Sequence, residues 1–460
     1  MKKRSTIDQW SLLWELVRLL WARPIYNFYF RKIKIVNAGV IHRGEPVILA
    51  PNHQNALMDA LAIVAGIKYQ TVFLARADIF KGGLVDQILK FLKILPIYRI
   101  RDGISSLQKN DEIFDITVNV LHNRINPLLL FPEGNHGDKH RLRPLVKGIF
   151  RIAFKTQEEF KSNPGVKIIP VGIDYSHYWK FRQTQLIVFG QPIEVNTFWK
   201  TYEENNSTAI NELREKLADE MKKYMIHIET EEYYDVYMGL RLVYRKTMCR
   251  KMGLKTGDLY DEFLADKKLI ECLDIELTKN EKNLIELKSV YNDYSRVRDI
   301  LKFRDWVASK HRYSIAGNVL ALLISVFVWP LVLLGLFNNW PHFFIPVRFT
   351  KGIKDTQFFS TAKWGAGFVL IIIYFLILGI LALIFLPLWW IKILYILTLP
   401  SSGIFALAYR RFIIKSWAKI RYSASVKKRS SQTATFKALY DKLLQLTDKI
   451  VDEKLTAGQN

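Results

Sequence analysis

The chain has 460 residues, half of them hydrophobic, and its 67 lysines and arginines outnumber its 43 acidic residues, which gives a formal net charge of +24. This length suits two or three domains, and so positive a charge predicts an anionic partner, either nucleic acid or anionic lipid headgroups. The two cysteines, Cys249 and Cys272, have neither a paired nor a metal-binding spacing. This argues against a disulfide framework and a zinc site, and fits a reducing compartment.

Residues 1–34 are predicted to form an amphipathic helix at a membrane interface. Apolar side chains, three tryptophans among them, recur at helical spacing from Trp10 to Trp21. Charged Glu15 and Arg18 interrupt the apolar run, which excludes a signal peptide. Tryptophans on one face with basic flanks suit the interface between lipid and water, while a helix packed on its own domain is the alternative.

Residues 35–200 alternate short apolar runs with helical patterns, which predicts an α/β domain whose sheet is covered by helices. Buried strands are expected at 46–50, 71–75, 127–131, 167–173 and 185–189. Helices are expected at 60–67, 84–92, 111–123 and 147–158.

Residues 201–312 are charged, poor in proline and glycine, and periodic at 3.6 residues, which predicts a helical region. One apolar stripe within it comprises Leu284, Leu287, Tyr291, Tyr294, Val297 and Leu301. We expect this stripe to pack on a neighbouring helix of the same chain, with a dimer contact as the alternative. The basic tail, residues 410–460, ends in an amphipathic helix over 435–455 that we expect to dock on the soluble part of the chain.

Residues 313–409 are predicted to be embedded in a membrane. Two runs without a charged residue, 313–347 and 364–391, exceed the roughly 20 residues that span a bilayer. The flanking segments 302–312 and 348–363 and the tail after Arg410 are basic, which places all three on the cytoplasmic side. That requires two helical hairpins, bent near Pro330–Asn339 and Pro387–Lys392. A single span at 314–337 is the alternative to the first.

Chemistry-bearing residues follow two of the apolar runs. The first run ends in Asn52-His53, with Asp59 at the start of the next helical pattern. A histidine at the carboxyl end of a strand, oriented by a carboxylate, is an effective general base near neutral pH. The run 128–131 ends in Pro-Glu133-Gly134, and cations follow it closely. Such a carboxylate among cations suits a hydroxyl and a phosphate, although capping the next helix is the structural alternative.

Two further blocks lie between and after these motifs. Pro96-Ile-Tyr-Arg99-Ile-Arg101 offers two guanidinium groups suited to phosphate, or to a surface pair with Asp102. Pro170 and Val171 stand in an apolar run that suits either an acyl chain or the core of the sheet.

The four blocks, in this order, resemble those of the glycerolipid acyltransferase (PlsC-type) family. Phe131-Pro-Glu-Gly134 matches the family's third motif letter for letter, while Pro-Ile-Tyr-Arg99 stands where a glycine-led segment is usual. Five residues separate His53 from Asp59, where the family commonly has four, and this leaves direct contact between them open. The longer spacing is similar to that of fungal-type glycerol-3-phosphate and dihydroxyacetone-phosphate acyltransferases and bacterial relatives.

The resemblance implies an enzyme that moves a fatty acyl group from acyl-CoA or acyl carrier protein to glycerol-3-phosphate, or to dihydroxyacetone phosphate, in phospholipid biosynthesis. It implies catalysis by His53 and Asp59 and a contribution of Pro170 and Val171 to acyl placement or structure. The residues implied for the acceptor phosphate are Arg99, Arg101, Glu133 and Gly134. No metal and no cofactor beyond the acyl donor is implied.

Two alternatives remain beside this interpretation: a lysophosphatidate acyltransferase, and a catalytically silent lipid-binding membrane scaffold. A nucleic-acid partner is disfavoured because the basic residues flank the membrane runs and no aromatic–basic recognition motif accompanies them. We therefore expect an integral membrane protein on an anionic lipid bilayer, with its catalytic domain on the cytoplasmic side of a bacterial inner membrane.

Overall fold

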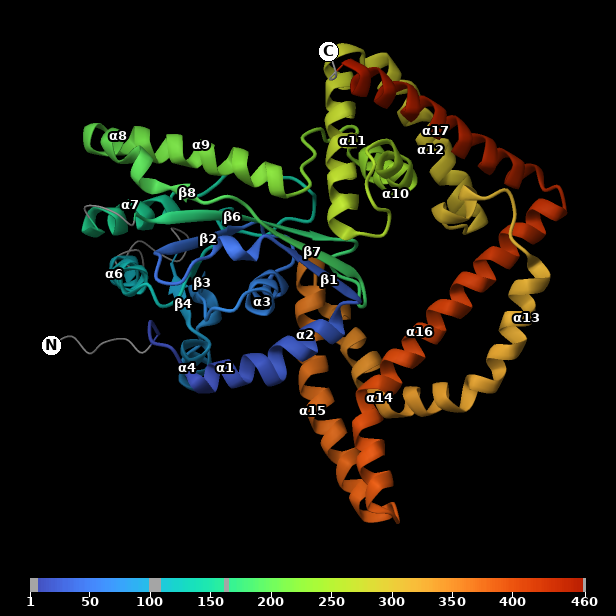
Figure 1. Cartoon of the computed structure of the whole chain (residues 1–460), viewed down its shortest axis with the longest axis horizontal. Helices are drawn as coiled ribbons and strands as arrows, with labels where there is room; N and C mark the ends of the chain where they lie inside the picture. Colours follow the sequence, from blue (N-terminus) through green and yellow to red (C-terminus); the bar gives the residue numbers. More distant parts are fainter. Residues whose placement is uncertain (1–6, 99–108, 161–164, 458–460) are drawn as a thin grey trace. The chain divides into compact units, whose positions relative to one another are not determined.

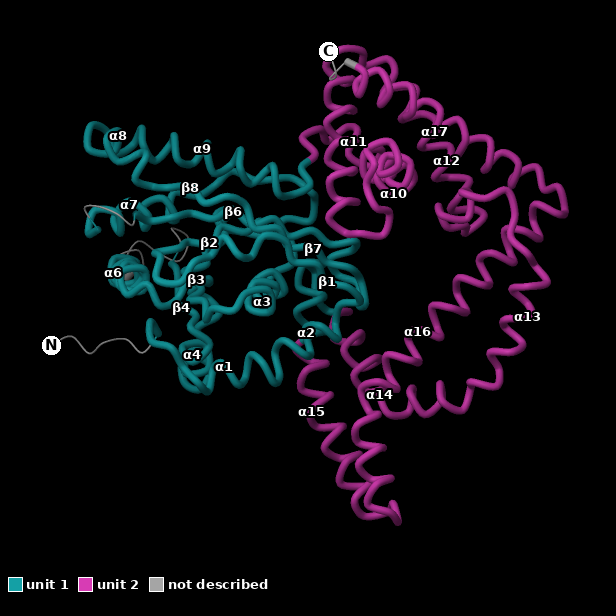
Figure 2. Tube along the Cα trace, in the orientation of Figure 1, with its two compact units in different colours: residues 1–227, 352–364 teal, residues 228–351, 365–460 magenta. Residues whose placement is uncertain are grey.

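The computed structural model describes residues 7–98, 109–160 and 165–457, which form two compact units (Figures 1 and 2). Unit 1 comprises residues 1–227 and 352–364, and unit 2 comprises residues 228–351 and 365–460. The expected domain border between residues 34 and 35 lies inside the first strand of unit 1.

Unit 1 contains one mixed sheet, which confirms the predicted α/β domain. Its strands in the described part of the chain are β1 (Lys32–Val36), β2 (Val47–Pro51), β3 (Val72–Arg76), β4 (Ile94–Ile97), β5 (Leu128–Leu129), β6 (Lys167–Tyr175), β7 (Thr184–Phe189) and β8 (Ile193–Glu194). They are ordered β1-β7-β6-β2-β5-β3-β4, with β8 beside β6. Strand β6 pairs antiparallel with β7 and β8, and the other pairs are parallel. All five predicted strands are present; β1, β4 and β8 are additional.

Helices cover both faces of this sheet (Figure 1). They are α1 (Leu12–Val17), a π-helical turn (Arg18–Ala22), α2 (Arg23–Tyr29), α3 (Leu57–Gly66), α4 (Gly83–Phe91), α6 (Lys109–Asn123), α7 (Gly148–Phe160), α8 (Trp199–Glu204) and α9 (Asn206–Tyr224). The alternation of side chains along β2 explains the two layers: Ile48 and Ala50 pack in the core under α6, α7 and α9. Val47 and Leu49 pack in the core with α2 and α3.

The N-terminal helix is docked on unit 1 by one side and exposes the other. Trp14 is buried, and the guanidinium of Arg18 donates to the carbonyl of Ile67 just after the end of α3 (2.8 Å). This satisfies a carbonyl at a helix end. Trp10 and Leu20 remain 57% and 65% exposed. One side of this segment is thus packed on its own domain, while the membrane-interface role of the exposed side stays a prediction.

Unit 2 begins with a helical bundle made of α10 (Tyr234–Lys251), α11 (Leu259–Lys279), α12 (Glu281–Leu301) and the C-terminal α17 (Ser431–Ala457). The ring of Tyr294, from the predicted apolar stripe, stacks on Phe436 of α17 with 5.3 Å between ring centroids. The two amphipathic patterns of the sequence therefore cover each other, as expected for a helix packed within the same chain.

Four apolar helices follow: α13 (Ile315–Ser325), α14 (Trp329–Phe349), α15 (Phe359–Phe385) and α16 (Trp389–Lys427). Joined through a 3-10 turn at Val326–Val328, the first two make one of three helical stretches that are long and apolar enough to cross a membrane. The turn between α15 and α16 confirms the bend expected near Pro387. The other bend lies at Val326–Val328, because α14 continues through Asn338 and Asn339.

These asparagines join helices instead of breaking one. The amide of Asn339 donates to the carbonyl of Leu399 in α16 (3.1 Å), and its oxygen faces Nε2 of His342 (2.9 Å). Gly335 and Gly403 permit the close approach, since a Cβ on Gly335 would lie 2.3 Å from the carbonyl oxygen of Ser402. Small residues and interhelical hydrogen bonds are the means by which helices associate in lipid.

Candidate active site

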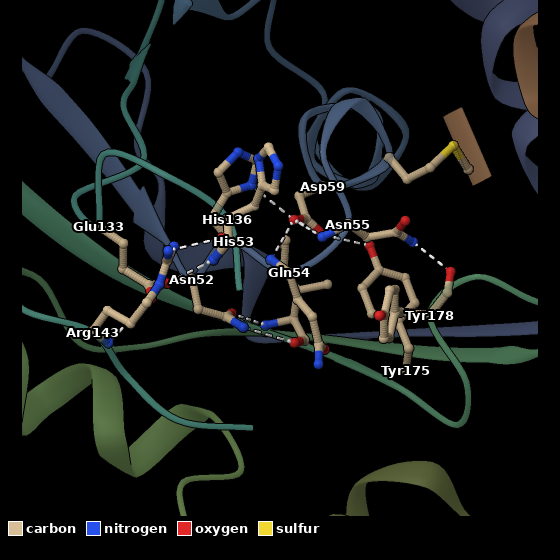
Figure 3. A network of polar contacts seen from close by, with 12 residues as sticks. Asn52, His53, Gln54, Asn55, Asp59, Glu133, His136, Arg143, Tyr175 and Tyr178 are labelled. Carbon is tan, nitrogen blue, oxygen red and sulfur yellow. Dashed lines mark hydrogen bonds and ion pairs between the residues drawn. The ribbon is translucent and has the colours of Figure 1, made fainter. Parts of the chain in front are cut away.

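The side chain of His53 lies at the carboxyl end of β2 and contacts Asp59 directly (Figure 3). Its Nδ1 is 2.9 Å from Oδ2 of Asp59, so Nε2 is the ring nitrogen that this contact does not use. The imidazole is 14% exposed and the carboxylate is fully buried. A buried carboxylate on one nitrogen fixes the ring orientation and favours a proton on that nitrogen.

The main chain explains how five intervening residues permit this contact. The amides of Gln54 and Asn55 donate to Oδ2 of Asp59 at 2.8 and 2.7 Å, which closes a tight loop around the carboxylate. Ala56 has a φ of 42° and a ψ of −126°, a conformation that favours glycine. The additional residue is therefore taken up by one strained turn before α3, and the question that the spacing left open is answered.

Tyr175 is a member of the site that the sequence did not single out. Its hydroxyl donates to Oδ1 of Asp59 at 2.6 Å, from the end of β6. Burial, with the nearby Asp59 carboxylate, raises the pKa of this phenol well above its ordinary value, so the hydroxyl remains a donor. The signal that could have revealed it is a tyrosine at the end of an otherwise apolar strand.

Two asparagines of the same turn fasten it to the neighbouring strand and loop. The amide group of Asn52 exchanges two hydrogen bonds with the main chain of Ile173 in β6, at 3.1 and 2.6 Å. Asn55 donates to the carbonyl of Tyr178 (2.7 Å) in the loop after β6, as Figure 3 shows. The turn that carries His53 is thus held by side chains on both sides of this residue.

Glu133 holds the main chain of His53. Its Oε1 accepts from the His53 amide (2.8 Å), and its Oε2 accepts from Nε of Arg143 (3.1 Å). Burial raises the pKa of this carboxyl, partly offset by these two donors. Gly134 has a φ of 66°, and a Cβ there would lie 2.9 Å from Val146. The Phe-Pro-Glu-Gly motif therefore sets the position of the histidine through a turn that needs its glycine.

His53 lies between two aromatic rings. Phe131 stacks on it with ring centroids 3.8 Å apart, and His136 meets it edge to face at 5.5 Å. The pKa of His136 is lowered to about 4, by burial first and then by His53 and the cations Arg143 and Arg76, while Asp355 acts in the opposite direction. His136 is therefore neutral at physiological pH.

A pocket opens beside His53 and Glu133. Lys139, His140 and Arg141 supply its basic wall, while Ile173, Met225 and Ile226 supply apolar groups. His140 also approaches the carboxylate of Asp174 at 3.6 Å. The lining thus includes His53 and several basic residues, a composition that suits an anionic ligand.

The remaining predicted site residues are placed as follows. Arg99 and Arg101 lie outside the described residues. Pro170 and Val171 are buried in β6, in register with Ala50 and Pro51 of β2. Val171 belongs to the core with α2 and α3, which fits the structural alternative. Within residues 7–98, 109–160 and 165–457, no group of three or more His, Cys, Asp or Glu side chains is arranged to hold a metal ion.

Part of this chain is similar in sequence to known acyltransferases. Residues 32–174 match the model of the acyltransferase family. Glycerol-3-phosphate O-acyltransferase 1 of Saccharomyces cerevisiae is 29% identical over 132 residues, which are 28% of this chain and 17% of that protein. Glycerol-3-phosphate O-acyltransferase 2 of the same yeast is 24% identical over 199 residues, 43% of this chain and 25% of that protein. The matches thus span a quarter or less of these relatives' length.

One solved structure is similar in part: the crystal structure of the 1-acyl-sn-glycerophosphate acyltransferase PlsC from Thermotoga maritima. It has a TM-score of 0.34 and 17% identity, and the match covers 48% of this chain and 84% of that chain.

The hydroxyl of Tyr175 offers a first test. Because it donates to a fully buried carboxylate, Tyr175→Phe should lower the free energy of unfolding by about 1–3 kcal/mol, the cost of an unsatisfied buried acceptor. Tyr69→Phe is the matched control, since that hydroxyl donates to the neutral carbonyl of Ile41. Thermal or urea denaturation should show the larger loss for Tyr175→Phe. An equal loss in the two variants would contradict the proposed role at Asp59.

The lowered pKa of His136 predicts a dependence of stability on pH. An unfolded chain takes up a proton near pH 6.5, but folded His136 takes it up only near pH 4. Stability should therefore fall as pH drops from 6.5 to 4. His136→Gln should flatten this decline in melting temperature, while His42→Gln, at an exposed histidine, should not. His177, whose pKa is also lowered to about 4, mainly by burial, contributes to the same slope.

Proposed function

We propose that this chain, whose residues 32–174 match the acyltransferase family, transfers a fatty acyl group from a thioester to a hydroxyl of glycerol-3-phosphate at a membrane. The observation that carries the proposal is the 2.9 Å contact between His53 and Asp59, with His53 also in the lining of a pocket that contains Lys139 and Arg141.

Proton transfer is the part of the reaction that His53 suits. With Nδ1 held by Asp59, Nε2 is the nitrogen that accepts the proton of the acceptor hydroxyl. Asp59 is buried and accepts hydrogen bonds from Gln54, Asn55 and Tyr175, which hold its carboxylate against the imidazole where it stabilises the imidazolium that forms. Such base catalysis contributes about 10²–10⁴-fold to the rate.

The remaining bond changes balance without a further reactant. The acceptor oxygen attacks the thioester carbonyl carbon, a C–O bond forms, and the C–S bond breaks. The thiolate that leaves takes back the proton that His53 accepted. The products are an ester and a free thiol, on coenzyme A or on acyl carrier protein.

The phosphate of the acceptor is assigned to the basic wall of the pocket. Lys139 and Arg141 lie beside His53 in this pocket, so a phosphate bound there would leave the glycerol hydroxyls within reach of the imidazole. Glu133 faces the amide of His53 and the guanidinium of Arg143, which supports a positioning role for it rather than a phosphate contact. Arg99 and Arg101 stay candidates from the sequence.

A membrane location is supported by two features. Three helical stretches, Ile315–Gly352, Thr356–Phe385 and Trp389–Lys427, are long and apolar enough to cross a bilayer. In unit 1, α4 exposes Leu84 and Ile88, and Lys93 after it donates to the carbonyl of Ile7, in the segment that precedes α1. Apolar side chains exposed together suit the lipid interface.

We place the catalytic domain on the cytoplasmic side, because the basic segments 348–363 and 410–429 fit the positive-inside tendency. The α15–α16 turn supports this, since one crossing out and one back returns the basic end of α16 to the starting side. The curated relatives are yeast proteins and give no support to a bacterial inner membrane, so the proposal retains the side alone.

Replacement of the base tests the proposal directly. His53→Ala should reduce transfer by about 10²–10⁴-fold, the usual contribution of a general base, in protein that circular dichroism shows to be folded. The assay uses purified full-length protein with acyl-CoA or acyl carrier protein as donor, and glycerol-3-phosphate, dihydroxyacetone phosphate or lysophosphatidate as acceptor. Transfer to lysophosphatidate alone would correct the acceptor. No transfer by the wild type would leave the silent lipid-binding scaffold as the better interpretation.

The phosphate site is tested by its cations. Lys139→Ala and Arg141→Ala should each raise KM for the acceptor about tenfold or more, the loss expected for a charge-assisted contact of roughly 1.5–3 kcal/mol, with kcat less affected. Lys147→Ala, an exposed lysine of the same segment outside the pocket lining, is the control. An unchanged acceptor KM in both pocket variants would remove this wall from the phosphate site.

A further inference from the structure

A short segment of the C-terminal half belongs to the catalytic unit. Gly352–Trp364 is part of unit 1, although the chain before and after it belongs to unit 2. In sequence it joins α14 to α15, and it includes the first residues of α15. Both helices lie in stretches that are long and apolar enough to cross a membrane.

The segment is bonded to the loop after β6. The hydroxyl groups of Thr356 and Tyr178 are 2.8 Å apart, and Ser360 donates to the carbonyl of Tyr178 at 2.7 Å. Lys363 donates to the carbonyl of Trp179 at 3.0 Å, and Phe359 packs edge to face on the ring of Trp179. Four side chains of the segment thus contact two consecutive residues, Tyr178 and Trp179.

These bonds reach the turn between the two catalytic residues. The carbonyl of Tyr178 accepts from Ser360 and also from Nδ2 of Asn55 (2.7 Å), so one oxygen uses both of its lone pairs. Asn55 in turn donates its main-chain amide to Asp59. Three hydrogen bonds in series therefore connect Ser360 of the segment to the carboxylate that orients His53.

An aromatic contact makes a second connection. The ring of Phe358 meets His136 edge to face with 4.8 Å between centroids, and His136 meets His53 in the same manner at 5.5 Å. Phe358 therefore fixes the ring that stands beside the catalytic imidazole.

Burial shows that the segment is packed and does not merely touch the domain. Ser360 is fully buried and Gln357 is 8% exposed. Trp364 packs against the core that α2 and α3 form with the sheet. Residues 365–385 of α15 still supply about the 20 residues that a bilayer crossing needs.

We propose that Gly352–Trp364 completes the acyltransferase site: Thr356 and Ser360 hold the loop that fastens the His53–Asp59 turn, and Phe358 positions His136 beside His53. The proposal rests on the acyltransferase function argued above. Because α14 and α15 continue from the two ends of the segment, insertion of these helices into a membrane holds the catalytic turn at the lipid surface. There it meets an acyl donor and releases a lipid product.

If Gly352–Trp364 only tethered the domain, its variants would behave differently from those of a segment that positions the catalytic residues. A tether that is weakened lowers stability or membrane retention but leaves kcat unchanged for the folded molecules. A positioning role changes kcat, because a shift of about 1 Å in a catalytic group costs up to about 10²-fold.

The contact between Phe358 and His136 is tested by removing the ring of Phe358 and by a second variant that keeps a ring. Phe358→Ala in the full-length protein should lower kcat by about tenfold or more, with a smaller change in donor KM, and Phe358→Tyr, which keeps the ring, should restore most of the loss. Phe349→Ala is the matched control, since Phe349 is 60% exposed and lies before the segment. Unchanged kcat in Phe358→Ala, or a loss that Phe358→Tyr does not restore, would overturn the role of the ring.

The hydrogen bonds are tested by a readout that does not need activity. In the double variant Thr356→Val/Ser360→Ala, hydrogen exchange of the amides of residues 54–59 should be faster than in the wild type. Ser309→Ala/Thr435→Val is the control, because these hydroxyls bond to carbonyls of their own turns in unit 2. Equal exchange rates of these amides in the two double variants would contradict the proposal that Thr356 and Ser360 hold the His53–Asp59 turn. Wild-type protein that transfers no acyl group would refute the proposed function, while the exchange result would still decide whether the segment holds the turn.

Discussion

The buried carboxylate of Asp59 is the interaction on which the rest of the site depends. It receives two main-chain amides, a tyrosine hydroxyl and the imidazole of His53. An ionised carboxylate without solvent is costly unless its oxygens are satisfied, so these donors must be present before the pair can exist. The same bonds that stabilise the charge also fix the direction of the base. The hydrogen bonds that stabilise buried Asp59 are therefore the same ones that orient His53 for its proposed role.

The groups that bond to Asp59 and His53 come from parts of the chain that are distant in sequence. The turn after β2 supplies the pair, the end of β6 supplies Tyr175, and the Phe-Pro-Glu-Gly turn supplies Glu133, which binds the His53 amide. The parallel pairing of β2 with β5 and β6 explains this assembly, because parallel strands end at the same edge of a sheet. The segment Gly352–Trp364 adds a fourth contribution through Tyr178 and His136.

Exposed apolar side chains and apolar helices are connected to the site described above. The N-terminal helix exposes apolar side chains on unit 1, and the segment that contacts the loop beside the catalytic turn runs into an apolar helix. A substrate with a long acyl chain and a charged headgroup partitions to the lipid surface, so a site next to that surface shortens its path. The basic segments of the chain suit anionic headgroups.

The sequence by itself determined the α/β alternation, the apolar runs and the His53, Asp59 and Phe131–Gly134 motifs, because periodicity and local motifs are properties of neighbouring residues. It also paired the amphipathic stripe with a helix of the same chain. Tertiary structure alone decided that His53 and Asp59 touch across five residues, since that depends on the backbone of Ala56. It alone placed Tyr175 and the Gly352–Trp364 segment at the site. Contacts between distant residues leave no periodic trace in a single sequence, and this is why those parts were not predictable.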